Sequence, residues 1–465
     1  MKKIVLVLAV LLVSVSACKN PFLKKMLIEE EKGKTIPEKP HAPFVEGGAS
    51  LILSPDKLDI TVEVRTTDST PITVEGCTET SLASGSIYTW LHATGTVVIL
   101  KGKIIELDCS GTYNDNNKLT ALNVQGLTAL QRLYCGYNQF TAFDVQGLSA
   151  LQYLDCSNNR LTALDVQGCT ALQELYCGYN QLTTLDVQGL SALQSLGCIA
   201  NQLTALNVQD LTALQYLSCD RNQLTALDVQ GLTALLKLFC SNNRFTALDV
   251  QGLSTLQYLD CDNNQLTALD VQGLSALQWL WCYNNRLTAL NVQGCTALEG
   301  LWCYNNRLTA LNIQGCTALQ MLWCYNNKLT ALNVQSLTAL RRLNCSNNQL
   351  TTLNVQGCTA LQGLGCYSNQ LTALNVQGCP ALRGLDCCGN QLNDQAFTQI
   401  FSDLPTRTAG DGARCILYTE KPGVTEGNCT DFTTPAELQA AFQNAKDVKH
   451  WKMHKLNTSG DEEEI

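Results

Sequence analysis

The chain is poor in charge and in histidine. Charged residues make up 15% of its 465 residues, and histidine occurs only 4 times. Acidic residues outnumber basic ones by 40 to 31, which gives a formal net charge of −9. This balance provides no general basic field for a polyanion, so we expect no nucleic-acid partner. Low charge together with 45% hydrophobic residues also excludes a highly charged disordered chain.

Common signatures of active sites and metal sites are missing as well. The sequence has no glycine-rich phosphate loop, no pairing of a nucleophile with a base and no prominent pair of carboxylates. Many zinc sites combine cysteine with histidine or carboxylate ligands, and the histidines at 41, 92, 450 and 454 all lie outside the cysteine-rich middle of the chain. We therefore predict a protein that is not an enzyme and that uses neither a metal nor a cofactor.

Only one long apolar run is present, and it is too short to cross a membrane. It covers residues 4–17, follows two lysines and is typical of a signal peptide. The quartet Val15-Ser16-Ala17-Cys18 resembles a bacterial lipobox, which implies that Cys18 becomes the lipidated first residue of the mature chain. Simple cleavage near Ala17, which would release a free secreted protein, is the alternative.

The segments on either side of the middle differ in composition. Residues 18–48 are rich in charge and proline, which predicts a flexible tether after the lipidated cysteine. Residues 49–103 contain short alternating runs such as 58–64 and predict a β-rich amino-terminal cap. Such a cap would cover the open end of a stacked array.

Residues 393–465 predict a small carboxy-terminal cap of mixed α/β structure. Apolar spacing predicts a helix over 394–404, a strand over 413–418 and a second helix over 435–445. We expect the acidic tail at 461–464 to be solvated and mobile.

Between residues 104 and 392 a unit of 21 residues repeats. One cysteine recurs at this spacing from Cys135 to Cys387, and Cys109 precedes Cys135 by 26 residues, which indicates 14 units with an insertion near 113–117. Each unit contains L-x-x-L-x-C-x-x-N-x-L followed by T-A-L-D/N-V-Q-G. This is the signature of leucine-rich repeats, with cysteine in place of the third leucine. It predicts an open horseshoe or arc, mainly β, with a continuous parallel sheet on its concave face.

The alternation in L-x-C indicates which side chains are buried. Leu154 and Cys156 should point inward, whereas Tyr153, Asp155 and Ser157 should point to solvent. The asparagine three residues after each cysteine should satisfy backbone groups inside the turn and form a ladder. A unit of this length leaves no room for a long outer helix, so we expect an extended or 3₁₀-like outer arc.

Most of the 24 cysteines occupy these inward positions. Neighbouring strands lie about 4.8 Å apart with parallel side chains, which strains disulfide geometry, so buried free thiols are expected. A second apolar position carries Cys169, Cys295, Cys316, Cys358 and Cys379, which we also interpret as structural. The most plausible disulfide set is Cys388, Cys415 and Cys429, although the sequence does not pair them, and Cys77 stands alone.

The outward positions differ from repeat to repeat, and we expect function to reside there. Four of the 6 tryptophans fall on three consecutive predicted strands. Tryptophans in register should form one row, with a second row of tyrosines two residues further on and a basic border on the following loop. The candidate ligand-binding residues, which we call the aromatic belt, are Trp279, Trp281, Trp302, Trp323, Tyr283, Tyr304 and Tyr325. The basic border consists of Arg286, Arg307 and Lys328.

Three interpretations of the belt remain open. Cross-strand stacking alone stabilises a sheet by roughly 0.2–1 kcal/mol per pair, and a passive spacer would need no more. Tryptophan, tyrosine and arginine are also the residues enriched at binding hot spots, which favours a protein or extracellular-matrix partner. A row of rings with a basic border is equally compatible with an acidic glycan. We favour the protein partner and keep the glycan as the alternative.

The lipobox, the β-rich lead-in, the C-x-x-N-x-L repeats and the mixed cap together resemble the bacterial surface leucine-rich-repeat lipoproteins. The resemblance implies an exported protein, anchored by lipid to the bacterial outer membrane and exposed at the cell surface. Some members of that group act as adhesins or host-interaction factors. The resemblance assigns no binding residue, because this fold serves many unrelated ligands.

Overall fold

The structure is a computed structural model that describes residues 42–465 except for 113, 115 and 336. Residues 44–465 form one unit, and the description below concerns that unit alone. The predicted signal peptide, the lipidation site Cys18 and most of the tether over 18–48 lie outside the described residues. Among the described residues, no helix combines the length and apolar character needed to cross a membrane.

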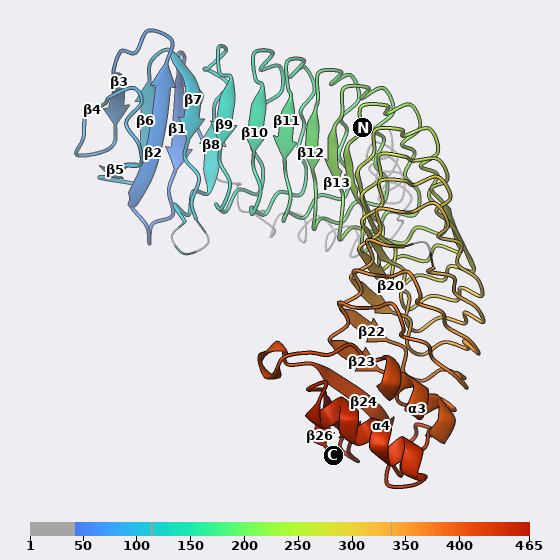
Figure 1. The fold of residues 1–465 in the computed structure, drawn as a ribbon. Helices are drawn as coiled ribbons and strands as arrows, with labels where there is room; N and C mark the ends of the chain where they lie inside the picture. Colours follow the sequence, from blue (N-terminus) through green and yellow to red (C-terminus); the bar gives the residue numbers. More distant parts are fainter. Residues whose placement is uncertain (1–41, 113, 115, 336) are drawn as a thin grey trace, which may run out of the picture. The chain divides into compact units, whose positions relative to one another are not determined.

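Each repeat contributes a short strand to one parallel sheet. In the repeat at 151–161 the side chains of Leu154 and Cys156 are fully buried, while Tyr153 and Asp155 are half-buried on the solvent side of the sheet. Tyr153 pairs in register with Glu174 of the next repeat, so equivalent positions form columns across the sheet. Strands of the later repeats line the inner side of the curve (Figure 1). The predicted concave parallel sheet is therefore confirmed.

The strands of this sheet follow one another in chain order through the repeats. They are β7 (Ile104–Asp108), β9 (Arg132–Tyr134), β10 (Tyr153–Asp155), β11 (Glu174–Tyr176), β12 (Ser195–Gly197), β13 (Tyr216–Ser218), β14 (Lys237–Phe239), β15 (Tyr258–Asp260), β17 (Trp279–Trp281), β19 (Gly300–Trp302), β20 (Met321–Trp323), β21 (Arg342–Asn344), β22 (Gly363–Gly365) and β23 (Gly384–Asp386).

The outer arc of the repeats consists of extended segments and turns. Its T-A-L-D/N segment is extended, and in two repeats it forms a second small parallel sheet of β16 (Ala268–Asp270) and β18 (Ala289–Asn291). The chain then turns at the glycine of the Q-G pair, for example Gly147 with a φ of 77°. The extended part of the predicted arc is thus observed, but the described repeats contain no 3₁₀ helix.

The amino-terminal cap joins the repeats in two places. One cap strand pairs antiparallel with β7 and so extends the concave sheet, while another pairs antiparallel with an outer-arc strand of the first repeat. The cap is therefore continuous with the sheet on one side and closes the outer arc on the other. The strands involved are β1 (Gly48–Ile52), β2 (Asp59–Thr66), β3 (Ile72–Glu75), β4 (Ser81–Leu82), β5 (Thr89–His92), β6 (Val97–Lys101) and β8 (Ala121–Asn123).

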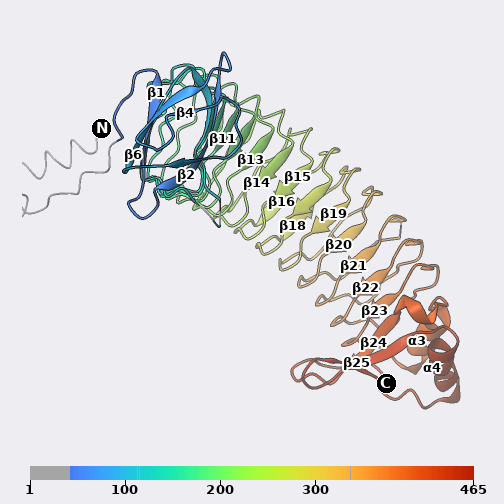
Figure 2. The ribbon, with the colours of Figure 1, turned by 90° about the vertical axis from the view of Figure 1, so that its left-hand side faces the viewer.

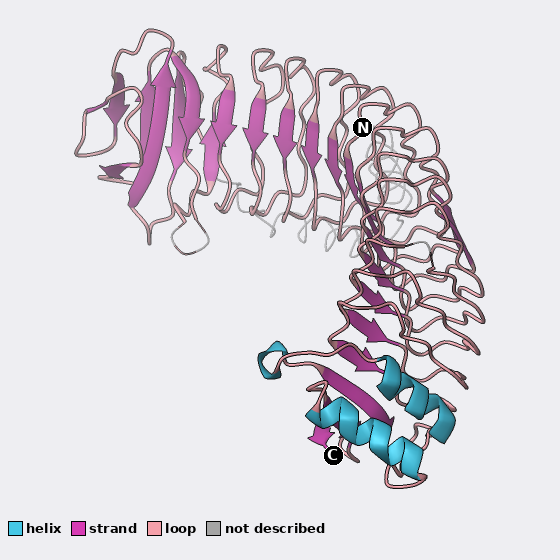
Figure 3. Cartoon of the chain, viewed as in Figure 1, coloured by secondary structure: helices cyan, strands magenta, loops and turns pink. Residues whose placement is uncertain are grey.

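The carboxy-terminal cap continues the sheet with three further strands and covers its end with two helices (Figure 3). The helices and the first of these strands lie where the sequence predicts them. The acidic tail, however, was expected to be mobile and instead forms a strand that pairs antiparallel with its neighbour. The elements are α3 (Asp394–Asp403), a single 3₁₀ turn η1 (Ala409–Asp411), β24 (Arg414–Thr419), α4 (Ala436–Asp447), β25 (Lys452–Leu456) and β26 (Glu462–Glu464).

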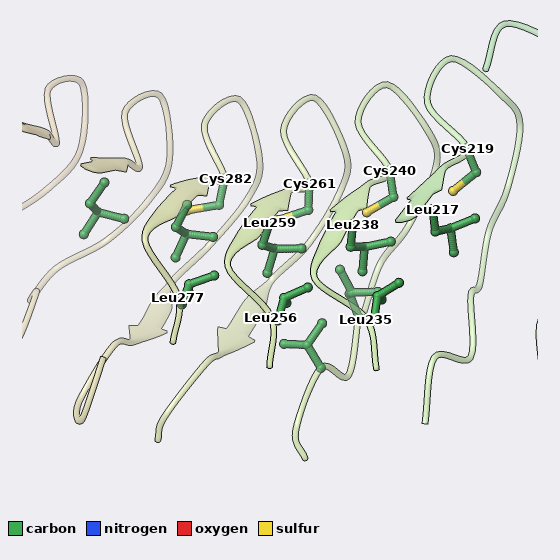
Figure 4. Close-up of a cluster of buried hydrophobic side chains, with 14 of the residues drawn as sticks. Leu217, Cys219, Leu235, Leu238, Cys240, Leu256, Leu259, Cys261, Leu277 and Cys282 are labelled. Atoms are coloured by element: carbon green, nitrogen blue, oxygen red, sulfur yellow. The ribbon is translucent and has the colours of Figure 1, made fainter. Parts of the chain in front are cut away.

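Leucine and cysteine side chains form the core of the stack. Figure 4 shows the column of Cys219, Cys240, Cys261 and Cys282 beside leucines of the same repeats. These thiols are free and fully buried, and burial raises the pKa of Cys240 well above its usual range. They therefore act as small apolar side chains.

The predicted disulfide set is not formed in the structure. Cys388, Cys415 and Cys429 are all free. The thiol of Cys415 lies against that of Cys387, and Cys415 takes the place of a leucine, since it pairs in register with Leu385 of β23. Cys429 is partly exposed, and its thiol donates to the backbone oxygen of Asp431, 3.1 Å away.

The asparagine ladder connects every repeat to the previous one. The amide of Asn264 donates to the backbone oxygens of Cys240, Cys261 and Asp262 at 3.0–3.1 Å, and its oxygen accepts from the backbone nitrogen of Phe245. Its hydrogen bonds thus span two repeats and satisfy groups that water does not reach.

Candidate functional site

The candidate residues lie on three consecutive strands of the concave sheet. Trp281, Trp302 and Trp323 are paired in register across β17, β19 and β20. Trp279 is also on β17, two residues before Trp281, so all four indoles belong to the solvent side of the sheet. Figure 2 shows β19 and β20 side by side, followed by β21, β22 and β23.

The tryptophans cluster more tightly than a single row. The rings of Trp281 and Trp302 stack at 5.3 Å, and Trp279 stacks on both, at 5.9 Å and 5.5 Å. Gly300 makes this possible, because a Cβ atom there would lie within 2.7 Å of indole atoms of both Trp279 and Trp302. The row ends at Trp323, whose ring meets Trp302 edge-on with an interplanar angle of 69°.

The tyrosines form a regular second row. Tyr304 stacks between Tyr283 and Tyr325, with ring centroids 4.4 Å apart on both sides and nearly parallel planes. Both faces of Tyr304 are therefore covered, and the row presents ring edges to solvent. All of the belt side chains are half-buried, since their rings shield one another.

The three residues of the basic border are exposed, but the structure does not bring them onto the rings. Among the described residues, no ion pair or cation–π contact involves Arg286, Arg307 or Lys328. Side-chain amides lie between them and the tyrosine row in sequence. Asn284, Asn305 and Asn326 each donate to the equivalent asparagine of the preceding repeat, at 2.6–2.8 Å.

The acidic pair Asp260 and Asp262 borders the belt on its amino-terminal side. These two residues were not among the predicted site residues. Asp260 is in register with Trp281, and the Asp262 carboxylate accepts a hydrogen bond from Tyr283. Burial, followed by the proximity of Asp262, raises the pKa of Asp260 to about 7. The D-x-D pattern at 260–262 directly before the tryptophan strands was a usable signal in the sequence.

Within the described part of the chain, no cluster of three or more histidine, cysteine, aspartate or glutamate side chains could hold a metal ion. The chemistry of the belt is therefore that of aromatic surface, amides and carboxylates.

Comparison with family models supports the repeat assignment. A family model described as leucine-rich repeats in two copies matches residues 149–192 and 317–357. No curated protein matches the sequence.

Solved structures with a similar fold include two bacterial proteins. The functional domain of InlJ from Listeria monocytogenes, which includes a cysteine ladder, is 28% identical with a TM-score of 0.57, over 70% of this chain and 76% of that one. A leucine-rich-repeat protein of Leptospira interrogans is 23% identical with a TM-score of 0.54, over 74% of this chain and 94% of that one. The repeats and the fold are thus those of leucine-rich-repeat proteins.

Proposed function

We propose that this chain, a leucine-rich-repeat protein, is a cell-surface recognition protein of the adhesin type. It binds a protein or extracellular-matrix partner on the concave sheet, and the aromatic belt is the centre of the interface. The observation that carries the proposal is the cluster of four stacked indoles beside a stacked tyrosine row on consecutive strands.

The fold itself does not require these rings. Equivalent positions carry Gly197 and Ser218 in earlier repeats, and the same strand pairing continues through them. Tryptophan and tyrosine bury large areas at little cost in side-chain entropy, which explains their frequency at the centres of interfaces. A sheet of about 65 Å by 15 Å offers on the order of 1,000 Å², which matches one side of a standard protein interface.

The ring geometry favours a protein over the glycan alternative. Sugars stack on open ring faces, whereas Tyr304 has both faces covered and Trp302 is stacked on Trp279 and Trp281. The remaining ring edges, together with amides and the carboxylates of Asp260 and Asp262, suit the mixed apolar and polar surface of a folded protein.

We further propose that the chain is exported and attached to the bacterial outer membrane by acyl groups on Cys18. The lipobox supports this location, and a single lipidated terminus followed by a tether would let the concave sheet face outward. Labelling cells with a clickable fatty acid tests the anchor, because Cys18→Ser should lose the label. Protease treatment of intact cells tests the orientation.

The test of the interface is a double substitution, Trp281→Ala with Trp302→Ala, in the purified chain. Binding is measured against a panel of purified extracellular-matrix proteins and against a glycan array. We expect a matrix protein that binds the unmodified chain to lose at least tenfold in affinity, since hot-spot rings each contribute about 2 kcal/mol or more.

The matched control replaces Tyr153 and Tyr176, a contacting aromatic pair with ring centroids 5.8 Å apart on the same sheet. This variant loses comparable cross-strand contact but leaves the belt intact, so its binding should stay within about twofold. Equal losses in both variants would show that sheet stability, not the belt, governs binding. Loss of glycan signals alone would favour the alternative.

A further inference from the structure

A second candidate site lies where the concave sheet meets the carboxy-terminal cap. The structure has a hollow of about 560 Å³ there, within the size range of ligand pockets. It begins at Trp323, at the end of the aromatic belt, and ends against β24 and β26. Figures 1 and 3 show the loop that carries η1 extending from the cap on the concave side of the sheet. We call this space the glycine hollow.

Its floor is made of strand positions that have no side chain. Gly363 on β22 pairs with Gly384 on β23, and Gly365 occupies the next outward position of β22. A Cβ atom added at Gly363 would meet nothing within 4 Å, and at Gly384 only a backbone oxygen at 3.9 Å. Strand glycines of this kind often mark a close approach of a ligand to the backbone. The hollow therefore exists because these positions lack side chains, and the packing of the sheet does not require glycine at Gly363 or Gly384.

One further group lies at the floor. The Oγ atom of Ser346 is fully buried and has no hydrogen-bond partner among the described residues. A Cβ atom on Gly365 would lie 3.4 Å from this oxygen. This hydroxyl group lies behind the floor at Gly365 and does not line the hollow itself.

The far wall of the hollow is held rigidly. The guanidinium of Arg407 donates to the backbone oxygens of Leu382, at 2.9 Å, and of Pro380, which fixes the η1 loop to the last repeat. Asp411 in that loop accepts from the backbone nitrogen of Thr408 at 2.9 Å. The loop is thus a built wall of the hollow.

Some of the charged side chains around the hollow already have partners in the fold, and others can still bind a ligand. Glu462 is paired with Arg414 at 3.0 Å, and the Asp411 carboxylate already closes the turn of its own loop. Arg342 and Arg383 are exposed, line the hollow and form no ion pair with any described residue. Arg383 makes a long hydrogen bond of 3.3 Å to the side chain of Gln362. The pKa of Asp411 is lowered mainly by its hydrogen bonds with Thr408, and the charge of Arg383 contributes to the same effect without an ion-pair contact. Two guanidinium groups are therefore free to bind an anion.

We propose that the glycine hollow binds an extended peptide segment that carries side-chain carboxylates. Arg342 and Arg383 bind the carboxylates, and the peptide backbone lies over Gly363 and Gly384. Guanidinium and carboxylate groups form strong paired hydrogen bonds, which fix the orientation of the two groups in addition to the attraction between their charges. The side chain of Asn344, which lines the hollow, supplies a polar partner for the main chain of the peptide.

The lining favours an acidic peptide over a sulfated glycan, the other polyanion that arginine binds. Asp386, Asp411 and Glu462 line the same hollow and would repel a chain with closely spaced sulfates. A peptide carries fewer charges, and its N–H groups can donate to these carboxylates. A lining that offers both hydrogen-bond donors and acceptors therefore fits a peptide. The hollow shares Trp323 with the belt but none of its other rings, and the proposed contacts with the peptide do not depend on the interface proposed above.

The test uses fluorescein-labelled hexaglutamate and the purified full chain, followed by fluorescence anisotropy at low salt. We expect binding that falls at least tenfold in Arg342→Glu with Arg383→Glu. Gly363→Leu with Gly384→Leu should cause a similar loss, because the new side chains would extend into the hollow from Cβ positions that contact no side chain of the fold. Circular dichroism checks that each variant is folded.

The control with the same change in charge is Arg286→Glu with Arg307→Glu, in the basic border of the belt. Its affinity for hexaglutamate should stay within twofold of the unmodified chain. Equal losses in this control and in the hollow variant would indicate general charge attraction and overturn the proposal. No binding up to about 1 mM peptide would overturn it as well.

A heparin-derived hexasaccharide serves as the competing probe. Tighter binding of this sugar than of hexaglutamate, with loss in the same hollow variants, would assign the site to a glycan and contradict the proposed peptide. Retained peptide binding in Trp281→Ala with Trp302→Ala is expected, since neither ring lines the hollow.

Discussion

Among single residues, the half-buried carboxyl of Asp260 gives the clearest dependence on pH. Its pKa is raised to about 7 by burial and by the neighbouring Asp262, whereas an aspartate in an unfolded chain has a pKa of about 4. The folded chain therefore binds more protons than the unfolded chain between these values. The stabilisation is fully present below about pH 4 and is lost as the pH rises through 7.

We predict that Asp260→Asn removes much of this dependence. The unmodified chain should lose free energy of unfolding between pH 5 and pH 8 because of this carboxyl group. In the variant that loss should be smaller by on the order of 1–2 kcal/mol, after allowance for solvent screening. Urea titrations followed by near-ultraviolet circular dichroism measure the difference. Asp155→Asn is the control. Asp155 occupies the equivalent strand position in an earlier repeat, but the residue two positions later is Ser157 and not a second aspartate. An unchanged difference in Asp260→Asn would contradict the assignment.

For single elements, the sequence was most informative where periodicity and packing agree. The L-x-C alternation predicted the strands and the buried cysteines, and apolar spacing predicted α3 and α4. Periodicity says nothing about contacts that only the three-dimensional structure creates. The acidic tail pairs with β25 because Arg414 and Lys455 lie opposite its glutamates. Likewise, the stacking of Trp279 on Trp302 depends on Gly300, which lies on the strand of Trp302 and pairs in register with Trp279.

Gly300 is therefore the element-scale test of the indole cluster. We predict that Gly300→Ala separates the rings of Trp279 and Trp302, because the new methyl group would lie 2.4 Å from a Trp302 ring carbon. The near-ultraviolet circular dichroism of the tryptophans should change, and stability should fall by about 1 kcal/mol, the worth of one or two aromatic contacts.

The matched control is Gly363→Ala, also at the first position of a repeat strand, where a Cβ atom meets nothing within 4 Å. It should leave both the spectrum and the stability nearly unchanged. An unaltered tryptophan spectrum in Gly300→Ala would mean that the indoles do not stack over this glycine.

At the scale of the whole molecule, the asparagine ladder extends into both caps. Asn117 begins it by donating to the backbone oxygens of Thr61 and Cys109, although it follows Cys109 by eight residues and not three. Asn428 ends it from the other cap, where no repeat spacing indicates a role. The caps thus complete the hydrogen bonds of the terminal repeats in addition to covering their apolar ends. Repeat spacing alone identifies the interior of such a ladder but not its two ends.

Asn428 should therefore control how the stack opens. Its amide donates to the backbone oxygens of Cys387 and Leu417, and its oxygen accepts from the backbone nitrogen of Leu392. Asn428→Ala removes the hydrogen bonds to the Leu392 nitrogen and the Leu417 oxygen, while the Cys387 oxygen keeps its bond from Asn390, at a cost of about 2 kcal/mol or more. Because each repeat contacts only its neighbours, the loss should remain near the carboxy-terminal end.

Hydrogen exchange measured by mass spectrometry checks this expectation. In Asn428→Ala, protection should fall in β22, β23 and β24 while β9 to β12 keep theirs, since stability in a stacked array is a sum of local terms. Asn207→Ala is the control, because its exposed side chain accepts one hydrogen bond of 3.0 Å from the backbone nitrogen of Gln209. Uniform loss of protection along the chain would mean that the repeats unfold as one cooperative unit and that the cap does not act locally.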